Sequence, residues 1–177
     1  GSKTLSSLKG YLRQPGSKDT EQWEDLRFTL SQLHPESVEA LIPLLQEAGS
    51  REASEGIRNA VRELAERDAR PLSRLARHAE PVVAREAIAI LSRVALDHVP
   101  VVLWEATRSS NGMVRRAAVQ GLMKQNAADC RQLALFLADS DDGTRNMVFR
   151  FLSRTRSQEV EASIAQYIRE GEFSRKD

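Results

Sequence analysis

Residues 80–91 read EPVVAREAIAIL, and residues 111–122, which lie 31 positions later, read NGMVRRAAVQGL. When the two segments are aligned, four columns agree in character: Val83 with Val114, Ala87 with Ala118, Ile88 with Val119, and Leu91 with Leu122. Spacings of four, five and eight residues place the four side chains of each segment on one face of a helix. The stretch 80–122 therefore predicts two similar helices that are buried along the same stripe.

The same pattern occurs twice more in the chain. Residues 141–152 fit 30 positions after the second copy, with Thr144, Val148, Phe149 and Leu152 in the four columns. A weaker copy lies 27 positions before the first, with Ala60, Val61 and Leu64 in the last three columns. A period of about 30 residues is typical of folds that stack helical repeats. The alternative is an ordinary helical bundle, because any amphipathic helix carries an apolar stripe, but a bundle does not require similar helices at nearly constant spacing.

The polar turn at 111–113, followed by Val114 and Arg115 and then by Ala118 and Leu122, resembles the HEAT-repeat family in its short bacterial form. The copy at 141–152 departs from the family in having Thr144 in place of the valine, and the copy at 80–91 has its arginine one place later, at Arg85. The resemblance implies an all-α fold, a right-handed superhelix of about five helix pairs and a capping helix over residues 3–171. Such repeats serve mainly as binding scaffolds, so the resemblance implies an architecture rather than a chemistry.

Apolar periodicity and helix breakers predict eleven helices along the chain. Their expected ranges are 3–14, 20–33, 36–48, 55–67, 68–79, 81–96, 97–109, 113–125, 128–138, 144–155 and 158–171. Pro43 lies inside the third of these helices and predicts a kink there. Gly1-Ser2 looks like the remnant of a cleaved tag and no initiator Met follows, so we expect a piece of a longer protein, with a frayed tail at 172–177.

Composition limits the classes of protein that fit the chain. Cys130 is the single cysteine and excludes an internal disulfide, which fits a reducing compartment and favours a cytoplasmic protein. The resemblance to the short bacterial repeats implies a bacterial one. No apolar run approaches the length of about 18 residues that a membrane span needs.

The sequence contains no pattern that predicts catalysis. The three histidines, His34, His78 and His98, have no metal-ligand spacing, and a pair of cysteines for zinc is absent. A phosphate-binding glycine loop and a nucleophile elbow are absent as well. The HEAT-like enzymes include iron-dependent hydroxylases, which need His-Glu pairs, and bilin lyases. We therefore expect no enzyme activity, no cofactor and no metal. For Asp141, in a turn before a predicted helix, we expect the role of a helix N-cap.

Charge is distributed unevenly along the chain. Residues 19–68 hold twelve acids and five arginines, a net charge of −7, whereas residues 112–156 hold eight arginines and lysines and four aspartates, a net charge of +4. Two places after the leucine column stand Glu66, Arg93, Lys124 and Arg154, with Arg62 and Arg150 one turn earlier. In the resembled family the second helices line the concave surface, and packed helices lie about 8–10 Å apart, so these cations would form a ladder.

The candidate partner-binding residues are therefore Arg93, Lys124, Arg150 and Arg154, with Gln120 between them. The alternative is a solvated helical face without a partner. The arginines near the predicted helix starts are expected to pair with acids in the turns, such as Asp141; they are Arg58, Arg85, Arg115, Arg116 and Arg145.

We expect a monomeric, non-enzymatic scaffold that binds a protein or peptide in its groove, where the basic ladder would suit an acidic partner. Nucleic-acid binding is the second interpretation, because HEAT-like alkylpurine DNA glycosylases belong to the resembled family. Those enzymes use aromatic residues and a carboxylate at the groove, whereas Trp23 and Trp104 fall on helices whose periodicity buries them. A regulatory or docking domain of a larger enzyme or transporter is the third interpretation.

Overall fold

The computed structural model describes residues 28–30, 32–155, 161–162, 165 and 169. Every regular element in this part of the chain is a helix, which confirms the predicted all-α class. In chain order the elements are η1 (Pro35–Ser37), α3 (Val38–Glu47), α4 (Arg51–Arg67), α5 (Arg70–Leu75), α6 (Pro81–Leu91), α7 (Val99–Ala106), α8 (Gly112–Lys124), α9 (Cys130–Ala134), η2 (Leu135–Ala138) and α10 (Asp142–Leu152).

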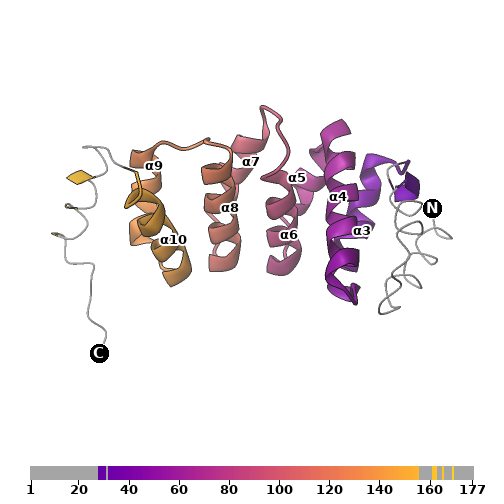
Figure 1. The fold of residues 1–177 in the computed structure, drawn as a ribbon, viewed down its shortest axis with the longest axis horizontal. Helices are drawn as coiled ribbons and strands as arrows, with labels where there is room; N and C mark the ends of the chain where they lie inside the picture. The colour runs from indigo at the N-terminus through magenta and orange to yellow at the C-terminus, as the bar shows by residue number, and fades with distance from the viewer. Residues whose placement is uncertain (1–27, 31, 156–160, 163–164, 166–168, 170–177) are drawn as a thin grey trace.

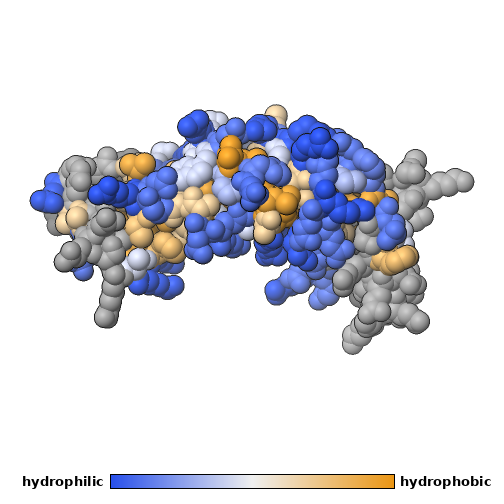
Figure 2. Space-filling view, turned by 90° about the horizontal axis from the view of Figure 1, so that it is seen from above, coloured by the Kyte–Doolittle hydropathy of each residue, from blue (hydrophilic) through white to orange (hydrophobic). Residues whose placement is uncertain are grey.

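The helices form consecutive pairs. Each of α4, α6 and α8 packs on the helix before it, and α10 packs on α9 and η2. The second helices α4, α6, α8 and α10 stand side by side along the molecule in Figure 1, and each contacts the next. Seen from above in Figure 2, the described part is bowed along its long axis.

The repeated columns form the core, as predicted. The small-residue column, Ala60, Ala87, Ala118 and Val148, is fully buried, and so is the leucine column, Leu64, Leu91, Leu122 and Leu152. Phe149 is the exception, because it is 38% exposed where the equivalent Ile88 and Val119 are buried. Val119 packs into the apolar cluster of the following pair, whereas α10 is the last complete helix in the described part.

The buried side chains fall into two clusters. The larger one runs from Leu30 to Leu122, and the smaller one consists of Val119, Leu133, Leu137, Val148 and Leu152. Helix α8 belongs to both, because Val114, Ala118 and Leu122 face the larger cluster while Val119 faces the smaller one. The last pair is therefore attached to the rest mainly through α8.

Capping side chains set several helix starts. Ser50 accepts a hydrogen bond from the Ala53 amide at 3.1 Å, so α4 begins four residues earlier than predicted. Asn111 caps α8, Asp129 forms a capping box with Gln132 at α9, and Asp141 caps α10 as predicted.

Several predicted helices were too long. Helix α5 covers six residues of the predicted 68–79, and α6 ends at Leu91 rather than at 96. The side-chain Nε2 of Gln125 donates to the carbonyl oxygens of Leu91 (3.2 Å) and Val94 (2.9 Å), which satisfies backbone groups at and just beyond the end of α6. The predicted 128–138 helix is α9 followed by the 3-10 turn η2, and α7 covers eight residues of 97–109.

The predictions at the two ends are only partly covered by the structure. The helix at 3–14, most of that at 20–33 and most of that at 158–171 lie outside the described residues; residues 28–30, 161–162, 165 and 169 are helical. Pro43 lies inside α3 as predicted. Of the helices that the structure describes, none combines the length and the apolar character that crossing a membrane requires.

Candidate partner-binding surface

The arginines at the helix starts form a network along the edge that holds the turns within each pair. Arg115 Nε and Nη2 donate to the Asp139 carboxylate at 2.9 and 2.8 Å, and Nη1 donates to the carbonyl oxygens of Ser109 and Ser110 at 2.9 and 3.0 Å. Both side chains of the Arg115–Asp139 pair are largely buried. The guanidinium holds the pKa of Asp139 below its usual range, and it ties the α7–α8 turn to the η2–α10 turn.

A second pair in the same network reaches the start of α10. Arg116 donates to both oxygens of Asp141, at 2.9 and 2.7 Å, and the same carboxylate accepts from the amide and hydroxyl of Thr144 at 2.7 and 2.8 Å. Arg116 is the largest cause that holds the pKa of Asp141 well below its usual range. A Cβ on Gly143 would lie 2.0 Å from Arg116 Cζ, so a side chain there would displace the guanidinium.

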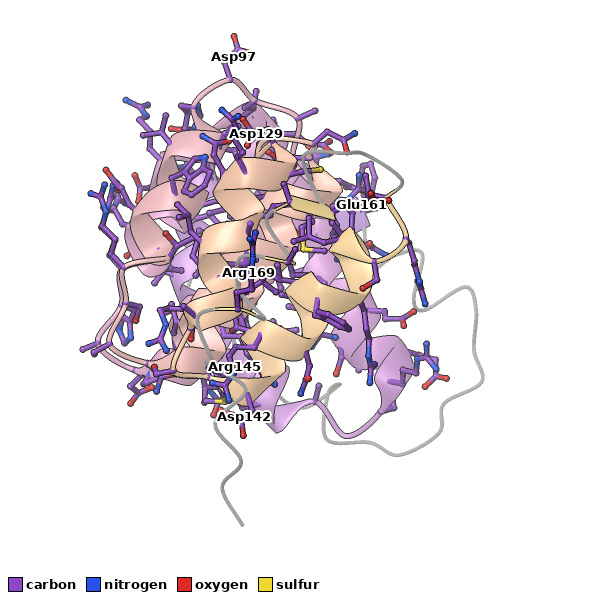
Figure 3. The ribbon with its side chains drawn as sticks, turned by 90° about the vertical axis from the view of Figure 1, so that its left-hand side faces the viewer. Asp97, Asp129, Asp142, Arg145, Glu161 and Arg169 are labelled. Atoms are coloured by element: carbon purple, nitrogen blue, oxygen red, sulfur yellow. The ribbon has the colours of Figure 1, made fainter. Side chains whose placement is uncertain are left out.

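These contacts confirm the predicted pairing of Arg115 and Arg116 with turn acids. Arg145 pairs instead with Asp142, the first residue of α10, at the end of that helix that lies opposite Asp97 and Asp129 in Figure 3. Arg58 and Arg85 also pair, but their shared partner, Glu86, lies in helix α6 rather than in a turn. The cations of this edge are therefore already occupied by acids of the same chain.

The predicted site residues lie elsewhere, and all five are exposed. Arg93 follows the end of α6, Lys124 is the last residue of α8, Arg150 is in the last turn of α10, and Arg154 follows that helix. Gln120 lies one turn before Lys124 on α8. The repeat thus places these cations at the C-terminal ends of three neighbouring second helices, where the helix dipole favours positive charge.

The structure groups the four cations into two hollows. Arg93 and Lys124 line one of about 440 Å³, formed by the residues after α6 and the end of α8. Arg150 and Arg154 line another, of about 730 Å³, between α8 and α10. The linings of these two hollows do not include Gln120.

The side chains of the four cations make no hydrogen bond or ion pair with any residue that the structure describes. Their equivalents in the first complete pair behave differently, because Arg62 donates to Glu66 at 3.0 Å and the two charges neutralise each other. Helix α8 contains no acid, and Asp142 at the first position of α10 is the one acid in that helix. The face formed by α8 and α10 therefore presents unpaired positive charge.

Sequence reasoning missed the apolar part of the larger hollow. Met123 from α8, and Met147 and Phe151 from α10, line it together with Arg150 and Arg154. The three apolar side chains are half-buried over the smaller cluster, so their outer parts remain accessible. The spacing of Met147, Arg150, Phe151 and Arg154 along one stripe of α10 was a signal that could have revealed this floor.

A further hollow, of about 530 Å³, lies beside the turn network and includes His78 and the paired Arg77 and Glu105. His78 Nδ1 accepts from the Glu80 amide at 3.1 Å, and His34 Nδ1 accepts from the Glu36 amide at 3.4 Å, so both side chains bond to the backbone beside a helix start. Among the described residues, no three histidine, cysteine, aspartate or glutamate side chains gather closely enough to hold a metal ion.

Trp104 is half-buried and engaged on both sides. Its indole N–H donates to the Ala127 carbonyl oxygen at 3.3 Å, and its ring stacks on Phe136 with a centroid distance of 6.1 Å. Trp23 lies outside the described residues. Compared with known proteins, the sequence matches no protein-family model, and it matches no curated protein either.

Proposed function

We propose that this chain is a non-enzymatic scaffold, a HEAT-like solenoid that binds an acidic protein or peptide along the face of its second helices. The row of helix pairs and the buried repeat columns support the architecture. The observation that carries the function is the contrast between the two sets of cations. Arg115 and Arg116 are neutralised by acids of the chain, whereas Lys124, Arg150 and Arg154 are exposed and unpaired among the described residues.

The helix dipole accounts for part of this placement, because a cation at a helix C-terminus gains about 0.3–1 kcal/mol. It does not account for the scarcity of acids on the surrounding face, where Asp97 is the one acid among the described residues that line the two hollows. A surface with one sign of charge attracts partners of the other sign and increases their association rate. Reversal of these charges is therefore expected to slow association.

A peptide-display selection on the immobilised chain tests the proposal. We expect enriched peptides to be acidic, and to bind the Lys124→Glu/Arg154→Glu variant about tenfold more weakly, mainly through slower association. The matched control is Arg108→Glu/Arg131→Glu. It makes the same change in charge at two exposed arginines that are not among the four candidate cations. Equal weakening by both double variants would reduce the effect to net charge and contradict the proposal.

Nucleic acid is the competing partner for a basic face. Its binding would weaken steeply with salt, with a log–log slope of about one per neutralised phosphate. Trp104 is held by Ala127 and Phe136 and so is not free to stack on a base. The contrary result is an oligonucleotide that binds tightly, with a steep salt dependence, and displaces the selected peptides. That result would identify nucleic acid, rather than a peptide, as the partner of this face.

A further inference from the structure

We propose that the hollow between α8 and α10 is the specificity pocket of this face, and that it takes a bulky apolar side chain of an acidic peptide. This inference rests on the proposed function and names the class of partner. Arg150 and Arg154 lie in the hollow beside Met123, Met147 and Phe151, so positive charge and apolar surface occur together. A peptide that fits both must carry an apolar anchor flanked by aspartate or glutamate.

The repeat shows why a floor of large apolar side chains occurs at this step and not at the previous one. The residues that occupy the repeat positions of Met123, Met147 and Phe151 one pair earlier are Ser92, Ala117 and Gly121. These residues are small, and α8 packs closely there: a Cβ on Gly121 would lie 3.1 Å from Ser92 Cβ and from both δ carbons of Leu103.

At the α8–α10 step all three positions carry large side chains instead. Side chains of this size could be fully buried here only if α8 and α10 stood farther apart. Met123, Met147 and Phe151 are instead half-buried. Methionine is flexible and polarisable, and methionine-rich surfaces adapt to varied apolar partners. The exposed parts of these side chains thus provide an adaptable floor for an apolar anchor.

The charge of the rim selects among apolar partners. In the described residues Arg150 and Arg154 have no partner, and the rest of the lining, Gly143, Asn146 and Thr155, supplies no acid. A carboxylate that approaches the hollow would therefore meet two positive charges and no negative charge that repels it. The flanking acids would orient the segment and the anchor would fill the space over Phe151.

Methionine NMR can test the pocket directly, because the chain has three methionines. Met123 and Met147 line the hollow, whereas Met113 is 42% exposed at the start of α8 and serves as an internal control. The full chain, labelled at the methionine methyl groups, is titrated with an acidic peptide enriched by the display selection. We expect the Met123 and Met147 signals to shift while that of Met113 does not.

A matched peptide and a matched variant complete the experiment. Replacement of the peptide's bulky apolar residue by serine should weaken binding about tenfold, and Arg150→Glu/Arg154→Glu should do the same while Arg108→Glu/Arg131→Glu does not. Serine replacement leaves the protein unchanged, so this arm is independent of folding.

The outcomes separate the two proposals. If acidic peptides bind and respond to charge reversal, but the serine peptide binds equally well and Met123 and Met147 do not shift, the pocket is wrong and the proposed function stands. If no acidic peptide is enriched, both fail. Shifts of Met123 and Met147 on raising the protein concentration without peptide would assign the hollow to a second copy of the chain, and would overturn this inference.

Discussion

At the residue scale, the buried leucine column provides the most direct test of the repeat. Leu122 has no exposed surface and lies in the larger apolar cluster. Leu122→Ala should lower the free energy of unfolding by about 2–5 kcal/mol, from lost transfer energy and the cavity that remains. Urea unfolding followed by circular dichroism measures it, and a loss below about 0.5 kcal/mol, the range of surface substitutions, would contradict the assigned register.

Asn126 gives a second prediction, because its backbone is left-handed with φ of 50°. It ends α8: the Ala127 amide donates to Leu122 O at 2.9 Å, and the Asn126 amide donates to Met123 O at 3.3 Å, which is a Schellman motif. Asn126→Val should cost about 1–2 kcal/mol, since a β-branched residue is strained at positive φ. Asn126→Gly should retain stability, and equal losses in thermal melts of both variants would show that the turn is not strained.

The repeat columns could be read from the sequence because burial follows helical spacing, which is local information. The exposure of Phe149 could not, because it depends on what lies beyond α10. The floor formed by Met123, Met147 and Phe151 was missed for a related reason: apolar residues at helical spacing predict burial, and only the packing of two helices shows that these three are half-covered.

At the scale of elements, the turn network couples stability to pH. The pKa values of Asp139 and Asp141 are lower in the fold than in the unfolded chain, mainly because of Arg115 and Arg116. Their contribution is therefore fully present above the ordinary aspartate pKa of about 3.9 and is lost as pH falls through the lower folded values. We expect the free energy of unfolding to decrease between about pH 5 and pH 2.

Arg116→Gln tests the assignment. Because Arg116 is 45% exposed, its pair is partly screened, and the variant should lose about 1 kcal/mol near neutral pH. Its stability should also depend less on pH than that of the natural chain. Arg131→Gln, at an exposed arginine without a partner in the described residues, is the control; a parallel pH profile for Arg116→Gln would show that Asp141 is not the titrating group.

The cap of α10 at Asp141 was predicted, whereas Ser50 starts α4 four residues before the predicted position. The C-terminal ends and the first helices of the pairs were predicted less well. Gln125 bonds to carbonyl oxygens 34 and 31 positions earlier, and such a contact between α8 and the end of α6 has no local signature. Sequence reasoning placed Arg93, Lys124 and Arg154 at equivalent repeat positions. It could not show that Glu66 pairs with Arg62 while Lys124 is left unpaired among the described residues.

At the scale of the whole molecule, the two apolar clusters predict unequal local stability. The last pair has a small cluster of its own, and helix pairs in repeat arrays are stabilised mainly by their neighbours. Hydrogen exchange measured by mass spectrometry should therefore be faster in α9 and α10 than in α4 and α6. Leu152→Ala should increase exchange in α9 and α10 alone; equal acceleration in α4 would indicate that the chain opens as one unit.

Helix α8 supplies buried side chains to both clusters, an apolar wall to the larger hollow, and Arg115 and Arg116 to the turn network. Its remaining positions include Gly121, which is closed in by Leu103 and Ser92. A saturation mutational scan would accordingly find α8 the least permissive of the helices from α3 to α10, with Gln120 as an exposed, freely variable position. Among descendants of this protein, substitutions would then accumulate in α10 and in the helix pairs at the two ends. New binding preferences could arise in this way while α8 continues to connect the two apolar clusters.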